Sequence, residues 1–185
     1  DRDGNPFVTT DITLKTAQWL RSNVIRNYYR DIRKLRRRLT FKGVEDIAAD
    51  IETKLYNSIF SKKEQPEISL ADLTSKLEHI HELLVSDYHG MFANEVDALL
   101  NKVNTFGYHF ASLDIRQDSR VHHEAFMILL KGAQKQGVVN KYVDYLQLDE
   151  AEKIKFLTTL KGDLSPESFS DELVNKTLGS IRAMQ

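Results

Sequence analysis

Residues 106 to 119 read FGYHFASLDIRQDS, and this stretch decides how the rest of the chain is interpreted. Aromatic residues alternate with smaller or polar ones over Phe106–Phe110, and the alternation resumes after a slip of two residues. A period of two predicts a β-strand over about 106–116, with a bulge at the slip. Charged and polar groups follow at once, so Arg116 is expected at the carboxyl end of this strand.

Helices are predicted on both sides of the strand. Apolar residues recur every three or four positions in segments near 10–39, 45–60, 70–84, 92–103, 121–137, 154–160 and 173–181. Ser69 with Asp72, and Asp149 with Glu152, have the spacing of helix-capping pairs, and Ser119 is the expected N-cap of its helix. A single strand leaves its backbone donors and acceptors unsatisfied, so its sheet partners are expected outside these residues.

The composition is that of an ordinary soluble domain, with 41% hydrophobic and 29% charged residues among 185. Acidic and basic residues nearly cancel to a formal charge of -1, so no global field draws the chain to nucleic acid or to an anionic membrane. The absence of cysteine excludes disulfides and fits a cytoplasmic setting. No apolar run approaches the ~20 residues that span a bilayer. The sequence opens in a polar turn without Met, so we expect a piece of a larger protein.

The densest charge cluster lies near the end of the first predicted helix. Its members are Arg30, Arg33, Lys34, Arg36, Arg37 and Arg38. Basic helices bind phosphate backbones, which makes nucleic-acid binding a candidate function. The cations are spread around the helix among Tyr29, Ile32 and Leu35, however, and a solvated face near a helix C-terminus explains them without a ligand.

The histidines do not predict a metal site. His79 and His81 lie two positions apart on a predicted helix, and His122 and His123 are adjacent, so the members of each pair face different ways. No HExxH spacing occurs in the sequence.

Arg116 is the strongest candidate for a binding residue. A guanidinium at the end of a buried strand has limited freedom, five donors and a permanent charge, which suits a planar grip on a phosphate or carboxylate. An intramolecular ion pair of Arg116 with Asp114 or Asp118 explains the same residues without a ligand. The residues alone do not decide between ligand binding and this ion pair.

Two separate segments resemble motifs of one family. The first is DRDGNPFVT at residues 1–9, and the second runs from Phe106 through LDIRQDS at 113–119 to His122. Both resemble phosphoenolpyruvate carboxylase, in which a long helical stretch separates the two motifs, as it does here. Asp118 stands where Glu is common in that family, which keeps the charge but shortens its reach.

This resemblance implies a fold class that is mainly α: a helical segment of a helix-rich (β/α) barrel, with one or two barrel strands at about 106–116. Residues 1–185 would form a single internal segment of a larger chain. Active sites of such barrels lie at the carboxyl ends of the strands, and the resemblance implies that Arg116 binds the phosphate of phosphoenolpyruvate. The motif residues implied to lie near the site are Asp1, Arg2, Asp3, Gly4, Asn5, Asp114, Gln117 and Asp118.

The implied reaction carboxylates phosphoenolpyruvate with bicarbonate to oxaloacetate and phosphate, through carboxyphosphate and the enolate of pyruvate. Mg²⁺ or Mn²⁺ would stabilise the enolate oxygen. The family's catalytic histidine is expected before Asp1, and its metal ligands, catalytic lysine and glycine-rich arginine loop after Gln185. We therefore assign no catalytic or metal-binding residue within these 185 positions and expect the chain alone to be inactive.

The resemblance also implies a cytoplasmic, allosteric homotetramer of central carbon metabolism, with no nucleic-acid or membrane partner. Two alternatives are kept. One is a helical nucleic-acid-binding or scaffold module that uses the basic face Arg30 to Arg38. The other is a purely structural role, in which the helices at 10–39 and 45–60 carry the subunit contacts of a homo-oligomer.

Overall fold

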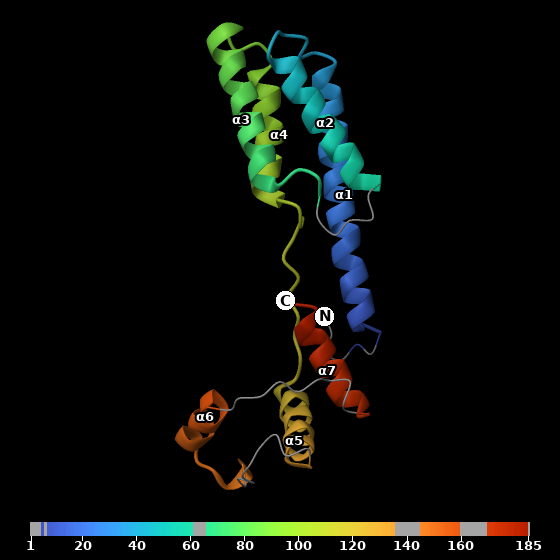
Figure 1. Ribbon diagram of the computed structural model, residues 1–185, viewed down its shortest axis with the longest axis vertical. Helices are drawn as coiled ribbons and strands as arrows, with labels where there is room; N and C mark the ends of the chain where they lie inside the picture. Colours follow the sequence, from blue (N-terminus) through green and yellow to red (C-terminus); the bar gives the residue numbers. More distant parts are fainter. Residues whose placement is uncertain (1–4, 6, 61–65, 136–144, 160–169, 185) are drawn as a thin grey trace. The chain divides into compact units, whose positions relative to one another are not determined.

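The computed structural model describes residues 5, 7–60, 66–135, 145–159 and 170–184 (Figure 1). The chain divides into two compact units. One comprises Lys15–Leu113 and is called the four-helix unit here. The other, which we call the Arg116 unit, comprises Asp1–Leu14 together with Asp114–Gln185. In the described residues every regular element is helical, which confirms the mainly α class.

Four helices supply the core of the four-helix unit (Figure 1). They are α1 (Thr10–Arg36), α2 (Val44–Phe60), α3 (Leu70–Asp87) and α4 (Ala93–Phe106). Each helix buries apolar residues that recur every three or four positions, as the sequence pattern predicts. The largest fully buried side chains are Ile32, Leu39, Ile51, Leu55, Ile68, Leu73, Leu77, Ile80, Leu84, Val44, Val96 and Val103. Burying each such side chain contributes roughly 1.5–3 kcal/mol, so this core holds the four helices together.

Local capping determines where two of the helices begin. The Ser69 hydroxyl accepts from the backbone N–H of Asp72 at 3.0 Å and donates to its carboxylate at 2.7 Å. At the helix Glu150–Thr159, Asp149 Oδ1 accepts from the Glu152 N–H at 2.8 Å, and Glu152 Oε2 accepts from the Asp149 N–H at 3.2 Å. Both capping pairs predicted from spacing are confirmed, because each arrangement satisfies N–H groups that the helix itself leaves unpaired.

The prediction of a strand over 106–116 is wrong for this structure. Phe106 is the last residue of α4, and residues 112–118 have no regular structure. The backbone N–H of Phe110 donates back to the Phe106 carbonyl at 2.9 Å, so the chain continues as a turn where alternation predicted a strand. A strand needs a neighbour for its backbone groups, and the described residues supply none. The barrel context therefore remains an expectation from family resemblance.

Two details of the first helix also differ from the prediction. It ends at Arg36 instead of Leu39, although Leu39 is fully buried in the core beyond the helix end. Trp19 is one of the apolar residues whose spacing predicts this helix, and a core position is expected for it, but it is 66% exposed. The buried residues of α1 begin only at Val24, because the earlier half of the helix runs past the helices that pack on it within the four-helix unit (Figure 1).

The Arg116 unit contains three α-helices and a short 3₁₀ helix in its described part. They are α5 (Ser119–Lys135), η1 (Tyr145–Gln147), α6 (Glu150–Thr159) and α7 (Glu172–Arg182). Ala125 of α5 and Val174 of α7 are buried in one small apolar cluster, and Ile128, Leu129 and Leu178 pack against it. This cluster joins the two helices. The ring of Tyr145 lies 5.0 Å from that of Phe126 and 5.8 Å from that of Phe156, so η1 links α5 to α6.

Asp171 caps α7 by accepting from the N–H groups of Leu173 and Val174 at 2.9 and 3.2 Å. On the same helix, a Cβ added to Gly179 would lie 3.2 Å from the Thr10 hydroxyl, so glycine permits a close approach there. Of the helices in the described part of the chain, none is both long enough and apolar enough to cross a membrane.

Candidate functional site

Arg116 lies in the irregular segment before α5, with 69% of its side chain exposed. Its Nε donates to Asp114 Oδ2 at 2.8 Å, which is one of the two ion pairs considered from sequence. An exposed pair of this kind contributes at most about 1 kcal/mol. Among the described residues only the Nε edge is occupied, so the four N–H groups of the two terminal nitrogens are available to an anionic ligand.

Asp118 has a different partner and a different role. Its carboxylate accepts from the backbone N–H of Arg120 at 2.8 Å and from the Arg120 side chain, and its carbonyl accepts from the N–H of Val121 at 3.0 Å. Asp118 therefore caps α5, where Ser119 was predicted to do so. The Arg120 side chain and backbone hydrogen bonds lower the pKa of the Asp118 carboxyl to about 2, so it is ionised at neutral pH.

A hollow of about 290 Å³ lies beside Arg116 within the Arg116 unit. Gln117 and His122 line it from the same segment and the start of α5. Thr177 and Ser180 line it from α7. The hollow thus gathers a guanidinium, an amide, an imidazole and two hydroxyls, and Ile115, Ile181 and Met184 complete its lining. The polar groups suit a small anion with several oxygen atoms.

Gln117 also lines a second hollow of about 840 Å³ in the same unit, together with Asn5. The two sequence motifs, more than a hundred residues apart, therefore meet at one place through Asn5 and Gln117. The Asn5 side chain accepts from the N–H of Phe7 at 3.0 Å, which holds the described part of the first motif as a turn. Asp1, Arg2, Asp3 and Gly4 lie outside the described residues.

Sequence reasoning missed the contribution of α7. Thr177 is 6% exposed, and with Ser180 it faces the hollow that contains Arg116. These residues stand about sixty positions after Arg116 and belong to no motif, so no signal in the sequence pointed to them.

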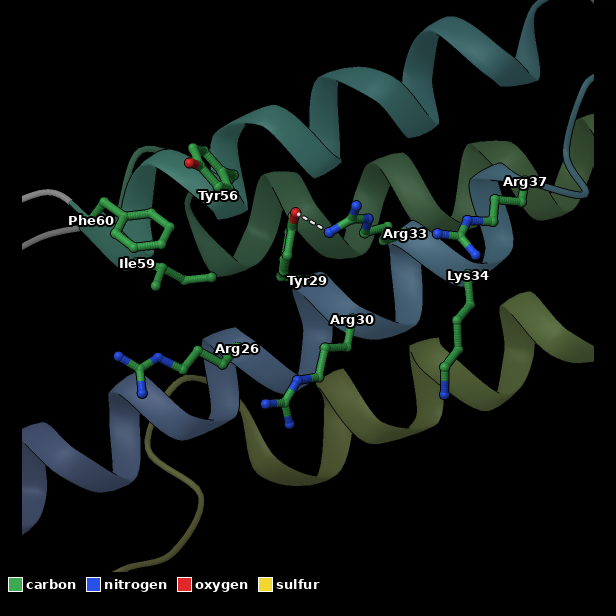
Figure 2. Close-up of a pocket in the computed structure, with 9 residues that line it drawn as sticks. All are labelled: Arg26, Tyr29, Arg30, Arg33, Lys34, Arg37, Tyr56, Ile59 and Phe60. Carbon is green, nitrogen blue, oxygen red and sulfur yellow. Dashed lines mark hydrogen bonds between the residues drawn. The ribbon is translucent and has the colours of Figure 1, made fainter.

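The basic face Arg30 to Arg38, which covers the end of α1 and the turn after it, is partly neutralised in the structure. Arg36 pairs with Glu52 at 2.6 Å and Arg38 pairs with Glu95 at 2.6 Å. Arg33 lies 4.0 Å from Glu52 and donates to the Tyr29 hydroxyl at 3.1 Å. The remaining cations of the face line a groove between α1 and α2, shown in Figure 2 and called here the α1–α2 groove.

Two of the six histidines lie near single carboxylates. His81 Nε2 is 3.3 Å from Asp97 Oδ1, and His79 Nδ1 is 3.8 Å from Glu82 Oε2. In residues 5, 7–60, 66–135, 145–159 and 170–184, no three His, Cys, Asp or Glu side chains are grouped to hold a metal ion. The described residues therefore do not form the Mg²⁺ or Mn²⁺ site that the resemblance implies.

Comparison with known proteins gives a consistent result. The family model described as phosphoenolpyruvate carboxylase matches residues 1–69 and 45–184. The phosphoenolpyruvate carboxylase of Bradyrhizobium diazoefficiens is 28% identical over 196 residues, which cover 85% of this chain and 20% of that protein. Those of Rhodopseudomonas palustris (strain HaA2) and Mycolicibacterium paratuberculosis are 28% and 26% identical, over 95% and 99% of this chain. The chain spans only about a fifth of the length of these relatives.

Proposed function

The chain belongs to the phosphoenolpyruvate carboxylase family, and from this premise we propose that it is a segment of an enzyme that carboxylates phosphoenolpyruvate with bicarbonate, giving oxaloacetate and phosphate. The observation that carries the proposal is the family match across both motifs, including the segment that contains Arg116. The hollow beside Arg116, whose lining includes Gln117, His122, Thr177 and Ser180, supports it.

In this proposal Arg116 binds the substrate phosphate. Its terminal nitrogens donate to phosphate oxygens, and Asp114, held at 2.8 Å on the Nε edge, orients the guanidinium plane. The positive charge offsets the negative charge of the phosphate while bicarbonate attacks the phosphorus. Gln117 and His122 lie on the same hollow and supply further donors to the anion.

The experiment compares Arg116→Ala and Arg116→Lys in the full protein that carries this chain. Loss of a hydrogen bond to a charged group costs roughly 1.5–3 kcal/mol, so Arg116→Ala should raise the KM for phosphoenolpyruvate about 10- to 100-fold. Lysine keeps the charge without the planar fork and should recover only part of the loss. Lys131→Ala, an exposed cation on α5, is the matched control. Unchanged KM in a folded Arg116→Ala enzyme would refute the assigned role.

Several further proposals rest on family membership. The enzyme is a cytoplasmic lyase of central carbon metabolism that works as an allosteric homotetramer. Its Mg²⁺ or Mn²⁺ would be held by residues other than the described ones. The 185-residue chain by itself should form no oxaloacetate from phosphoenolpyruvate, bicarbonate and Mg²⁺, because it spans about a fifth of its relatives. Measurable turnover by the purified chain would contradict this proposal.

A helical nucleic-acid-binding or scaffold module is the weaker candidate. Arg36 and Arg38 are each engaged by a carboxylate at 2.6 Å, which reduces the charge that the basic face offers to a phosphate backbone.

A further inference from the structure

Thr177 of α7 is a buried threonine whose hydroxyl makes no hydrogen bond with the described part of the chain. Hydroxyls inside helices usually bond to the carbonyl four residues earlier. In the same unit, the Thr158 hydroxyl donates to the Ile154 carbonyl at 2.9 Å. The Ser180 hydroxyl donates to the Lys176 carbonyl, also at 2.9 Å. The Thr177 hydroxyl lacks this bond and is available to another acceptor.

The Thr177 hydroxyl opens onto the two hollows of the Arg116 unit. In the described residues, every side-chain oxygen or nitrogen that is sealed from solvent has a partner, so an unpartnered hydroxyl must keep an opening. Thr177 lines both the hollow of about 290 Å³ that contains Arg116 and the hollow of about 840 Å³ that contains Asn5. Gln117 is the other residue that lines both. Thr177 and Gln117 therefore lie where the two hollows meet.

The packing of α7 fixes the position of this hydroxyl. Val174 is buried in one cluster with Ala125 of α5. Thr177 follows Val174 by three positions and shares its helix face. Beyond Thr177, a Cβ at Gly179 would lie 3.2 Å from the Thr10 hydroxyl, so α7 approaches the start of α1 closely there. A hydroxyl on a helix that is packed at both places can contact a ligand with little loss of freedom.

We propose that Thr177 is a further substrate-binding residue, whose hydroxyl donates a hydrogen bond to an oxygen of the anion that Arg116 binds. The inference rests on the proposed function, in which this anion is the phosphate of phosphoenolpyruvate. A buried polar group without a partner is unfavourable, and a bound anion removes that cost with a charge-assisted hydrogen bond. Ser180 lines the same hollow, but its proton is already donated to Lys176, so Thr177 is the hydroxyl that can donate without losing a bond.

The test compares Thr177→Val and Thr177→Ser in the full protein that carries this chain. Valine keeps the branched shape without the hydroxyl, and serine keeps the hydroxyl without the methyl group. Thr177→Val should raise the KM for phosphoenolpyruvate about tenfold by loss of one hydrogen bond to a charged group, with kcat within about twofold. Thr177→Ser should stay within about threefold of the parent KM, because its hydroxyl is retained.

Melting temperature without substrate separates substrate binding from a structural role. The Thr177 hydroxyl has no partner to lose among the described residues, so Thr177→Val should melt no lower than the parent protein. Thr158→Val is the matched control, since it makes the same substitution on α6 of the same unit, outside both hollows. It should leave the KM for phosphoenolpyruvate unchanged.

Three results would overturn the inference: an unchanged KM in folded Thr177→Val, a raised KM that Thr177→Ser does not restore, or a raised KM together with a lower melting temperature. A raised KM for bicarbonate alone would overturn it in favour of a contact with the second substrate. If Thr177→Val does not fold, Thr177→Ala is compared with Thr177→Ser, because these two differ only in the hydroxyl. An unchanged KM in Arg116→Ala refutes the proposed function, whereas a raised KM there with none in Thr177→Val refutes only this inference.

Discussion

Tyr28→Phe tests how α1 is attached to the end of α4. Tyr28 is 2% exposed, and its hydroxyl donates to the Gly107 carbonyl at 2.7 Å, with the Lys102 carbonyl 3.2 Å away. Phenylalanine keeps the ring and removes the donor, so the only loss is the hydrogen bond and the satisfaction of a buried acceptor. A group left without its partner costs about 1–3 kcal/mol, and we expect the free energy of unfolding to fall by about 2 kcal/mol.

The assay is urea unfolding of the chain followed by far-ultraviolet circular dichroism. With a slope of roughly 2 kcal/mol per molar urea, the midpoint should fall by about 1 M. Tyr29→Phe is the matched control, because in the described part of the chain its hydroxyl accepts from the exposed side chain of Arg33, and loss of this bond should cost under about 0.5 kcal/mol. Equal midpoints for Tyr28→Phe and the parent chain would refute the claim that this hydrogen bond secures α4.

The same tyrosine predicts alkaline sensitivity. Burial raises the pKa of Tyr28 to about 12, from 10.0 in the unfolded chain. Between these values the unfolded state releases a proton that the folded state retains, so stability should be constant below about pH 10 and should fall as pH rises toward 12. Tyr28→Phe should remove part of this fall, measured as urea midpoints at pH 9 and 11. A parallel pH dependence in the two proteins would contradict the explanation.

Three more predictions follow from other parts of the chain. Leu77→Ala, at a fully buried position of α3, should lower the free energy of unfolding by about 2–5 kcal/mol in urea titrations, whereas a loss under 1 kcal/mol would show that the core at this position is not packed as described. The Asp118 carboxyl should stay ionised in an NMR titration until pH approaches 2, and Arg120→Ala should return its pKa toward the usual range, since Arg120 lowers it in the folded chain. Asp171→Ala should cost about 1 kcal/mol by removing the cap of α7, and retention of α7 amide protection from hydrogen exchange would argue against that cap.

Most helices could be predicted from the sequence, because their signals are local. The Ser69 and Asp149 caps depend on residues three positions away, and the apolar stripes of α2 and α3 depend on spacings of three and four. Exposure of Trp19 could not be predicted this way, since a stripe shows which face is apolar but not how far the covering helices extend.

The alternating residues before Arg116 mark the limit of local reasoning. Alternation is compatible with a strand, but a strand is stable only where a neighbouring strand accepts its hydrogen bonds. In the structure, the end of α4 and a turn over Phe106–Phe110 stand at this place instead.

What the sequence alone determined is the helical framework, its caps, the two family motifs and the candidacy of Arg116. Only the tertiary structure decided which groups meet: Asn5 and Gln117 on one hollow, Thr177 of α7 beside Arg116, and Asp118 as a helix cap. It also decided that Arg36 and Arg38 of the basic face are paired with carboxylates. The reason is physical: pairing and enclosure depend on distances between residues far apart in the chain, and no local pattern encodes those distances.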